Sequence, residues 1–459
     1  MVLELINLIK VKYLRYYGLF FEGGRHTYII LVSIYLFVPY LSNELASNPV
    51  EGQRMVAEYS LYSGLFISLL APLIGSVADE YGPRKPLMWF VTVAMIILLW
   101  SLWWSKSDLS GLSIDNIVAI LLTLNILFAC SEVLHNSMLL HVAGREYVHY
   151  ASGMGMSLGN GVSFIILIFT ILFFYFPGHY ETNWLPDSSL FGLSINEHEP
   201  ERLAGPLTAT LLILCGIPFL LFAKDHKRTG RSFLSSLSSG VKKILQTMLL
   251  LRNNHTVAKY LLARMLFSDA ITTVVIFSGV YASGVMKWHG EMLLFYGVIM
   301  SFASAIGGRM AAFLDNKLGA RSALIFQLMM TIAGLMLLVG TGRQHVAFIP
   351  IDYILSDNTL LKNIIPDVSY FIFSFSNAMF ITATFASSRT LLVRLTPPSE
   401  SGKWFGLYAL SGTITAWLAP VLVLWSTEAF NSQQAGMVAL VLLLMLSVWV
   451  MKFIPKLNF

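Results

Sequence analysis

Apolar runs long enough to cross a lipid bilayer recur along almost the whole chain, and they constrain its fold more than any other feature. Hydrophobic residues make up 56% of the sequence. Only 12% are charged, about half the share found in soluble globular domains. A helix of about 20 apolar residues spans the hydrocarbon core. The sequence therefore predicts an all-α protein embedded in a membrane.

Twelve such spans are expected, six on each side of a polar central stretch. The first six cover residues 17–41, 55–77, 86–104, 117–140, 152–176 and 207–223. The second six cover residues 260–284, 292–313, 322–340, 368–392, 404–425 and 436–453. We therefore expect a six-helix bundle in 1–223, a cytoplasmic linker with an amphipathic helix in 224–258, and a second six-helix bundle in 259–459.

Lysine and arginine gather in the loops that alternate spans place on one side of the membrane. The positive-inside rule assigns that side to the cytoplasm, so both termini are expected there. The same bias accounts for the formal charge of +5 without a nucleic-acid partner. The two cysteines, Cys130 and Cys215, both lie in apolar runs and suggest neither a disulfide framework nor a metal site.

The two halves of the chain echo each other. Leu19-Phe20-Phe21-Glu22 in the first span is matched by Leu266-Phe267-Ser268-Asp269 in the seventh. The loop after the second span, GSVADEYGPRK at 75–85, is matched by AAFLDNKLGARS at 311–322. Two echoes in the same order indicate an internal repeat, and transporters often place their binding site at a repeat interface.

The loop after the second span carries the sharpest motif. It reads Gly75-x-x-x-Asp79-x-x-Gly82-x-Arg84-Lys85, and it resembles the signature loop of the major facilitator superfamily. The resemblance implies two pseudo-symmetric six-helix bundles that work by alternating access, with this loop as a gating latch of the outward-open state. An ordinary basic turn is the alternative. The second copy departs from the pattern, because Asn316 stands where the first copy has Asp79.

The physical chemistry of the motif fits a latch. A glycine at 75 allows helices to approach closely, and a glycine at 82 permits a tight turn. Asp79 suits a helix N-terminus, where the dipole favours an anion. Arg84 and Lys85 suit the anionic inner leaflet.

Residues 261–288, 387–420 and 70–85 also resemble the vacuole-effluxer family within that superfamily. The resemblance implies a bacterial inner membrane, or a vacuolar membrane if the source is fungal. It also implies, through fungal relatives that release amino acids from the vacuole, amino-acid export. The first span departs from the family pattern, because Glu22 is followed by Gly23, Gly24 and Arg25 instead of Trp, Ala and Asn. This departure is expected to affect the substrate.

Ionisable residues inside the predicted spans are the candidates for solute binding and proton coupling. Each costs roughly 2.5–3.5 kcal/mol to insert at the bilayer centre, so each invites a functional interpretation. They are Glu22, Arg25, Glu132, His135, Arg264 and Asp269. Burial disfavours the charged form of a carboxylate, so such a group can load and release a proton, while an arginine can hold a solute carboxylate through its fork. The alternatives are a structural ion pair for Glu22 with Arg25, and an Arg264 that extends to the membrane surface.

The sequence thus predicts a secondary active transporter for a small-molecule substrate. We expect it to be coupled to protons and to work as a monomer in the lipid bilayer, without a cofactor or metal. No Walker-type Gly-x-x-x-x-Gly-Lys loop is present, which argues against direct ATP drive. Two alternatives use other chemistry: a non-transporting sensor or assembly factor on the same fold, and a membrane-embedded lipid enzyme. The enzyme is disfavoured, because neither a His-Glu-x-x-His nor a Gly-x-Ser-x-Gly motif occurs.

Overall fold

The computed structural model describes residues 21–108, 110–143, 159, 161–177, 188–223, 225, 250–354, 359–396 and 401–455. The chain divides into two compact units. The first comprises Met1–Leu45 with Leu69–Leu245, and the second comprises Ala46–Ser68 with Gln246–Phe459. Helix α3 (Pro49–Tyr81) therefore contributes to both units. Of the amphipathic helix expected in the linker, residues 232–249 lie outside the described part of the chain.

The prediction of a helical membrane protein is confirmed. Ten helices within the described residues are long and apolar enough to cross a membrane. They are Phe21–Leu45, Pro49–Gly75, Lys85–Trp104, Ile114–His135, Glu199–Phe222, His255–Met286, Gly290–Leu318, Ala320–Val339, Leu361–Leu395 and Gln433–Lys452. Two shorter apolar helices, Gly161–Tyr175 and Leu418–Phe430, coincide with parts of the fifth and eleventh predicted spans. The count of twelve spans stays a prediction.

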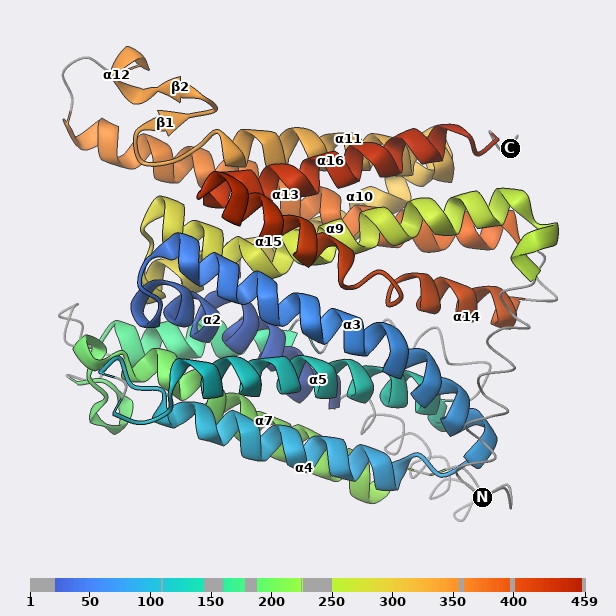
Figure 1. Cartoon of the computed structure of the whole chain (residues 1–459), viewed down its shortest axis with the longest axis horizontal. Helices are drawn as coiled ribbons and strands as arrows, with labels where there is room; N and C mark the ends of the chain where they lie inside the picture. Colours follow the sequence, from blue (N-terminus) through green and yellow to red (C-terminus); the bar gives the residue numbers. More distant parts are fainter. Residues whose placement is uncertain are drawn as a thin grey trace, which may run out of the picture. The chain divides into compact units, whose positions relative to one another are not determined.

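The first unit begins with a span that departs from regular α-helix. From Phe21 it continues through the π-helical turns η1 (Tyr28–Tyr35) and η2 (Leu41–Leu45), which flank α2 (Phe37–Tyr40). The other elements of this unit are α4 (Lys85–Ser101), η3 (Leu102–Trp104), α5 (Ile114–Ala143), η4 (Ile171–Tyr175), η5 (Leu190–Gly192), η6 (Ile195–Glu197) and α7 (Glu199–Phe222). Helix α4 packs against both α5 and α7 (Figure 1).

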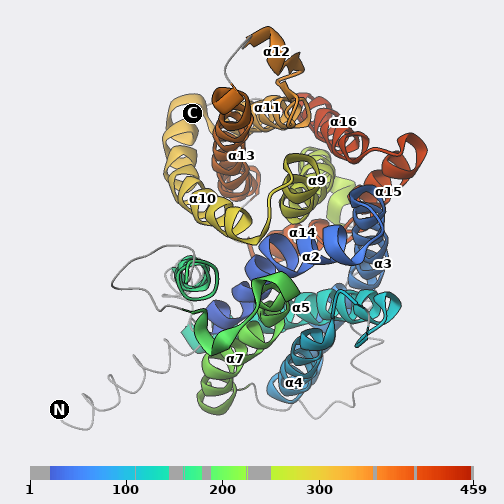
Figure 2. The same cartoon turned by 90° about the vertical axis from the view of Figure 1, so that its left-hand side faces the viewer.

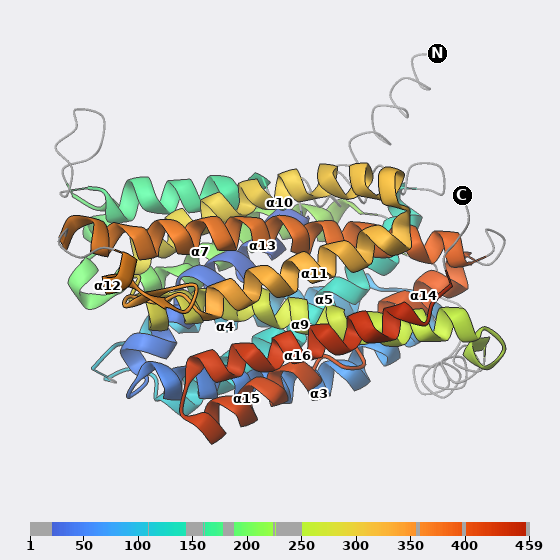
Figure 3. The same cartoon turned by 90° about the horizontal axis from the view of Figure 1, so that it is seen from above.

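The second unit holds the remaining elements. They are η7 (Leu250–Asn253), α9 (His255–Met286), α10 (Gly290–Leu318), α11 (Ala320–Val339), β1 (His345–Val346), β2 (Ile349–Pro350), α12 (Ile351–Ile354), α13 (Thr359–Leu395), α14 (Ser401–Ser411), α15 (Leu418–Phe430) and α16 (Gln433–Lys452). Helix α13 packs against α10 and α11, as the end-on view of Figure 2 shows. Helix α16 packs against α9, α11 and α15 (Figure 3). The strands β1 and β2 form one antiparallel pair.

Large apolar side chains are exposed along the outer faces of these helices. On α4 they include Phe90 and Ile97, and on α16 they include Leu442 and Trp449. A soluble protein rarely exposes contiguous apolar surface of this kind. Lipid is the solvent that such helix faces require.

Candidate functional site

Four of the six predicted charged candidates meet in one cluster of the first unit, and three of the four are buried. Arg25 donates from Nη2 to Glu22 Oε2 at 2.7 Å, and its Nη1 lies 3.4 Å from Glu132 Oε2. The Nδ1 atom of His135 lies 2.9 Å from Glu22 Oε1. Glu22 and Arg25 come from the first span, whereas Glu132 and His135 come from α5. The cluster therefore joins two predicted spans through charge.

Aromatic rings enclose the buried part of the cluster. The Arg25 guanidinium lies over Phe128, 4.7 Å from the ring centroid, which adds a cation–π contact. The His135 ring lies 5.1 Å from the ring of Phe21 and 5.4 Å from that of Phe219, measured between centroids. The side chain of Arg25 is only 5% exposed, but that of Glu132 is 49% exposed. One acidic group of an otherwise enclosed cluster thus remains open.

Two glycines allow the first span to pack closely against its neighbours beside the charged cluster. A Cβ atom at Gly24 would lie 2.8 Å from the carbonyl oxygen of Leu211 in α7, and one at Gly23 would lie 2.9 Å from Val162 Cγ2. Neither distance leaves room for a side chain. The Gly23-Gly24 pair, which departs from the resembled family's pattern, therefore allows close helix packing beside the charged residues.

The other two candidates lie in the second unit and bind main-chain atoms. Arg264 donates from Nη1 to the carbonyl oxygen of Tyr408 and, at 2.7 Å, to Ser411 Oγ. Its guanidinium lies 3.5 Å from the centroid of the Tyr408 ring. Asp269 accepts a hydrogen bond from the backbone N–H of Ala419 at 2.8 Å. Both side chains are buried, and both contact the interrupted span described below.

The signature loop is held by an aspartate that sequence reasoning missed. Asp225, just after α7, accepts from the backbone N–H groups of Arg84 at 2.9 Å and Lys85 at 3.2 Å, where α4 begins. Lys85 also donates from Nζ to the carbonyl oxygen of Leu221 at 3.2 Å. Asp225 lies 141 residues from Arg84 in the sequence, so no local pattern could reveal the pair.

The motif glycines differ in what the structure requires of them. Gly82 has a φ of 103°, which only glycine adopts without strain. A Cβ atom at Gly75 would meet Val133 at 3.5 Å, an ordinary contact, so space alone does not demand glycine there. The side chain of Asp79 lies outside the described part of the structure.

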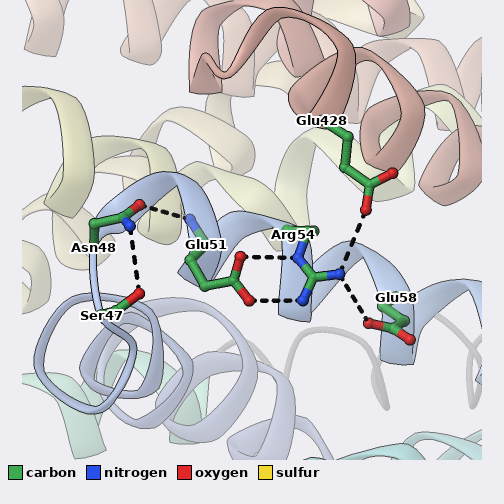
Figure 4. A network of polar contacts seen from close by, with 6 residues as sticks. All are labelled: Ser47, Asn48, Glu51, Arg54, Glu58 and Glu428. Atoms are coloured by element: carbon green, nitrogen blue, oxygen red, sulfur yellow. Dashed lines mark hydrogen bonds and ion pairs between the residues drawn. The ribbon is translucent and has the colours of Figure 1, made fainter.

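A second charged network lies at the N-terminal end of α3 (Figure 4). Arg54 binds Glu51 through two hydrogen bonds of 2.9 and 2.6 Å, and its Nη1 lies 3.8 Å from Glu58 and 3.4 Å from Glu428. Its side chain is 37% exposed, in contrast to that of Arg25. Nearby, Gln53 donates to Thr427 Oγ1 at 2.9 Å and to the carbonyl oxygen of Gln433 at 3.1 Å.

Within the searched, described residues, no group of three or more His, Cys, Asp or Glu side chains could hold a metal ion. Cys130 and Cys215 are both free thiols.

Comparisons with known proteins agree with this architecture. Residues 143–457 match the family described as vacuole effluxer Atg22 like. The uncharacterized MFS-type transporter YxiO of Bacillus subtilis (strain 168) is 20% identical over 451 residues, which cover 95% of this chain and 93% of that protein. These relatives are transporters, not enzymes.

Solved structures share the fold at low sequence identity. A mutant of the nucleoside transporter NupG has a TM-score of 0.63 at 12% identity, covering 97% of this chain and all of that one. The D-xylose-proton symporter has a TM-score of 0.63 at 11% identity, covering 98% of both chains. A bacterial homolog of the human lysosomal transporter Spinster has a TM-score of 0.63 at 14% identity, covering 96% of both chains. The chain therefore belongs to the Atg22-like vacuole effluxer family and has the fold of major facilitator transporters.

Proposed function

We propose that this transporter exports a small solute, of the amino-acid class, by alternating access driven by protons. The observation that carries the proposal is the cluster of Glu22, Arg25, Glu132 and His135. Its members contact one another at 2.7–3.4 Å, so a proton gained by one carboxylate changes the balance of charge around Arg25. The amino-acid class rests on the resemblance to vacuole effluxers.

Glu132 is the group through which the cluster meets water. It lies 18 residues after the start of α5 and 11 before its end, about 27 and 16 Å along the axis at 1.5 Å per residue. A charged side chain facing lipid at such a depth costs roughly 2.5–3.5 kcal/mol. The exposed Glu132 carboxylate therefore favours a water-filled path over a lipid contact, and it is the proton's entry point.

Arg25 supplies the positive charge that faces the two carboxylates of this cluster. Glu22, Arg25 and Glu132 together hold two carboxylates and one guanidinium, which gives these three residues one net negative charge. A proton or the ammonium group of a solute can neutralise that charge, and competition between them couples opposite fluxes. The terminal nitrogens of Arg25 face Glu22 and Glu132, so the ammonium end of an amino acid is the part that this cluster recognises.

We further propose an orientation, a membrane, an oligomeric state and a gating motif for this transporter. The basic loops place both termini in the cytoplasm by the positive-inside rule. The membrane is a bacterial inner membrane, or a vacuolar membrane in a fungus, and the transporter works as a monomer. The loop of Gly75, Asp79, Gly82, Arg84 and Lys85 is the gating motif.

Transport by the purified protein in liposomes tests this function. Vesicles are loaded with a mixture of ¹⁴C-labelled amino acids. Release is compared with and without a pH gradient in which the outside medium is more acidic than the vesicle interior. We expect release from protein-containing vesicles to exceed that from empty ones and to accelerate with the gradient. Release equal to that from empty vesicles would reject the amino-acid class, and release indifferent to the gradient would reject proton coupling. Retention of the same solute by cells that lack the protein tests the export direction.

A further inference from the structure

The eleventh predicted span, residues 404–425, is interrupted, although its sequence carries no charged residue. Helix α14 ends at Ser411 and α15 begins at Leu418, with turns in between (Figure 1). Gly412 follows the first half-helix directly, and Pro420 lies in the first turn of the second. A Cβ atom at Gly412 would lie 3.0 Å from Arg264 Nη1, so glycine leaves room for the guanidinium there, and proline is well tolerated in the first turn of a helix. The local sequence thus permits the interruption without requiring it.

Two opposite charges from α9 bind the two ends of the interruption. Arg264 donates to the Tyr408 carbonyl oxygen and to Ser411 in the last turn of α14, where the helix dipole is negative. Asp269 accepts from the Ala419 N–H in the first turn of α15, where the dipole is positive. The two side chains are five residues apart, about 7.5 Å along the α9 axis. Each charge therefore matches the helix end that it contacts.

Further contacts fix the turn residues between those ends. Thr415 donates from Oγ1 to the Met265 carbonyl oxygen at 3.3 Å. A Cβ atom at Gly64 of α3 would lie 2.4 Å from the carbonyl oxygen of Ala416, so only glycine lets α3 reach the turn this closely. The interruption is thus held by side chains of α9 and by the backbone of α3. Within the turn itself, the backbone N–H groups of Gly412, Thr413 and Ala416 donate to carbonyl oxygens three residues earlier, so local hydrogen bonds satisfy these donors inside the membrane.

We propose that Arg264 and Asp269 are positioning residues that hold the 412–417 interruption, so that this span bends there during transport, and that they do not touch the solute. The inference rests on the proposed function only for its transport consequence. Asp269 is 5% exposed and Arg264 is 7% exposed, and both bind backbone atoms of the interrupted span. Alternating access rocks one bundle of a transporter against the other, and a span that is already interrupted at 412–417 can bend there without breaking a continuous ladder of helical hydrogen bonds.

Amide hydrogen exchange of the full-length protein in lipid nanodiscs tests the structural part without any solute. Asp269→Ala removes both the charge and the acceptor, whereas Asp269→Asn retains an oxygen acceptor. We expect amide 419, which donates to Asp269, to exchange about fivefold faster in Asp269→Ala, as for a lost helix cap, with Asp269→Asn intermediate. Arg264→Gln should speed the amide exchange of residues 412–417. The matched control is Lys259→Gln, an exposed charge on the same helix, which should change neither. Wild-type exchange rates throughout 412–419 in all variants would overturn the proposal.

The transport part uses the single ¹⁴C amino acid that the wild-type protein releases fastest from the mixture. We expect Arg264→Gln and Asp269→Asn to lower the maximal rate several-fold while the half-saturating concentration stays at the wild-type value, and Arg264→Lys to restore part of the rate. A raised half-saturating concentration with an unchanged maximal rate would place these residues against the solute and overturn the proposal. If no amino acid moves, the proposed function fails while hydrogen exchange still decides the inference.

Discussion

At the scale of single residues, burial decides what a charge contact is worth. Arg25 and Arg54 both lie near more than one carboxylate, but the Arg25 side chain is 5% exposed and the Arg54 side chain is 37% exposed. Removing one partner of a buried ion pair leaves an uncompensated charge. When an exposed ion pair loses one partner, water solvates the other, so the loss of stability is small. The same residue type therefore has different energetic roles in the two networks.

This contrast yields a stability prediction. Arg25→Ala leaves Glu22 without its 2.7 Å partner, so we expect a loss of about 3–5 kcal/mol. The matched Arg54→Ala change removes a bidentate pair from a partly exposed network, so it should cost about 1 kcal/mol, at the upper end for exposed pairs. Denaturant unfolding of both variants in the same detergent measures the difference. Equal losses would show that the Arg25 cluster is no more strongly coupled than a surface network.

At the scale of secondary-structure elements, single atoms set how closely helices approach. A Cβ atom at Gly307 of α10 would lie 2.2 Å from the Met379 carbonyl oxygen in α13, whereas one at the adjacent Gly308 would meet nothing within 4 Å. The two glycines therefore differ in environment while sharing one helix. Small residues at such contacts are what allows helices to pack tightly in a membrane.

The adjacent glycines form a matched pair for measurement. Gly307→Ala forces α10 and α13 apart, and overpacking of this kind costs about 1–3 kcal/mol. Gly308→Ala should instead stabilise by about 0.5–1 kcal/mol, because alanine loses less backbone entropy in a helix. Thermal unfolding of the purified variants measures both changes in stability, the loss and the gain. A stabilising Gly307→Ala would contradict the close contact between α10 and α13.

The start of α4 offers a second test at this scale. Asp225 caps the backbone N–H groups of Arg84 and Lys85, so Asp225→Ala should cost about 0.5–2 kcal/mol and speed amide exchange at residues 84 and 85. Asp108, which caps Ser110 in an exposed turn, is the control. Its replacement by alanine should leave the exchange of residues 84 and 85 unchanged. Unaltered exchange in Asp225→Ala would show that Asp225 does not stabilise these two N–H groups of the signature loop.

At the scale of the whole molecule, the sequence indicated the class of fold but not its pairings. Apolar runs of bilayer length and the loop at 75–85 pointed to the major facilitator fold, which the comparisons support. The spacing of Glu22 with Arg25, and of Glu132 with His135, places each pair on one helix face. That the two faces meet depends on packing between the first span and α5, which no local pattern encodes.

The interrupted span marks the limit of sequence reasoning more sharply. Residues 404–425 have the composition of an unbroken span, yet α14 and α15 are separate helices. The charges that bind their ends belong to α9, and the Asp269 contact joins residues 150 positions apart. Tertiary contacts of this kind outweigh local propensity, which is only a weak guide. For the same reason, the sequence singled out Arg264 and Asp269 but not their partners.

The role of Glu132 in proton coupling is tested by comparing two modes of transport in one variant. Glu132→Gln removes the exposed acid of the cluster, and Glu291→Gln, on an exposed position of α10, is its control. In proteoliposomes carrying the ¹⁴C amino acid chosen above, exchange at equal pH is measured beside release driven by a pH gradient. We expect Glu132→Gln still to exchange solute but to gain nothing from the gradient, while Glu291→Gln behaves as wild type. Gradient-driven release at the wild-type rate in Glu132→Gln would contradict this role of Glu132.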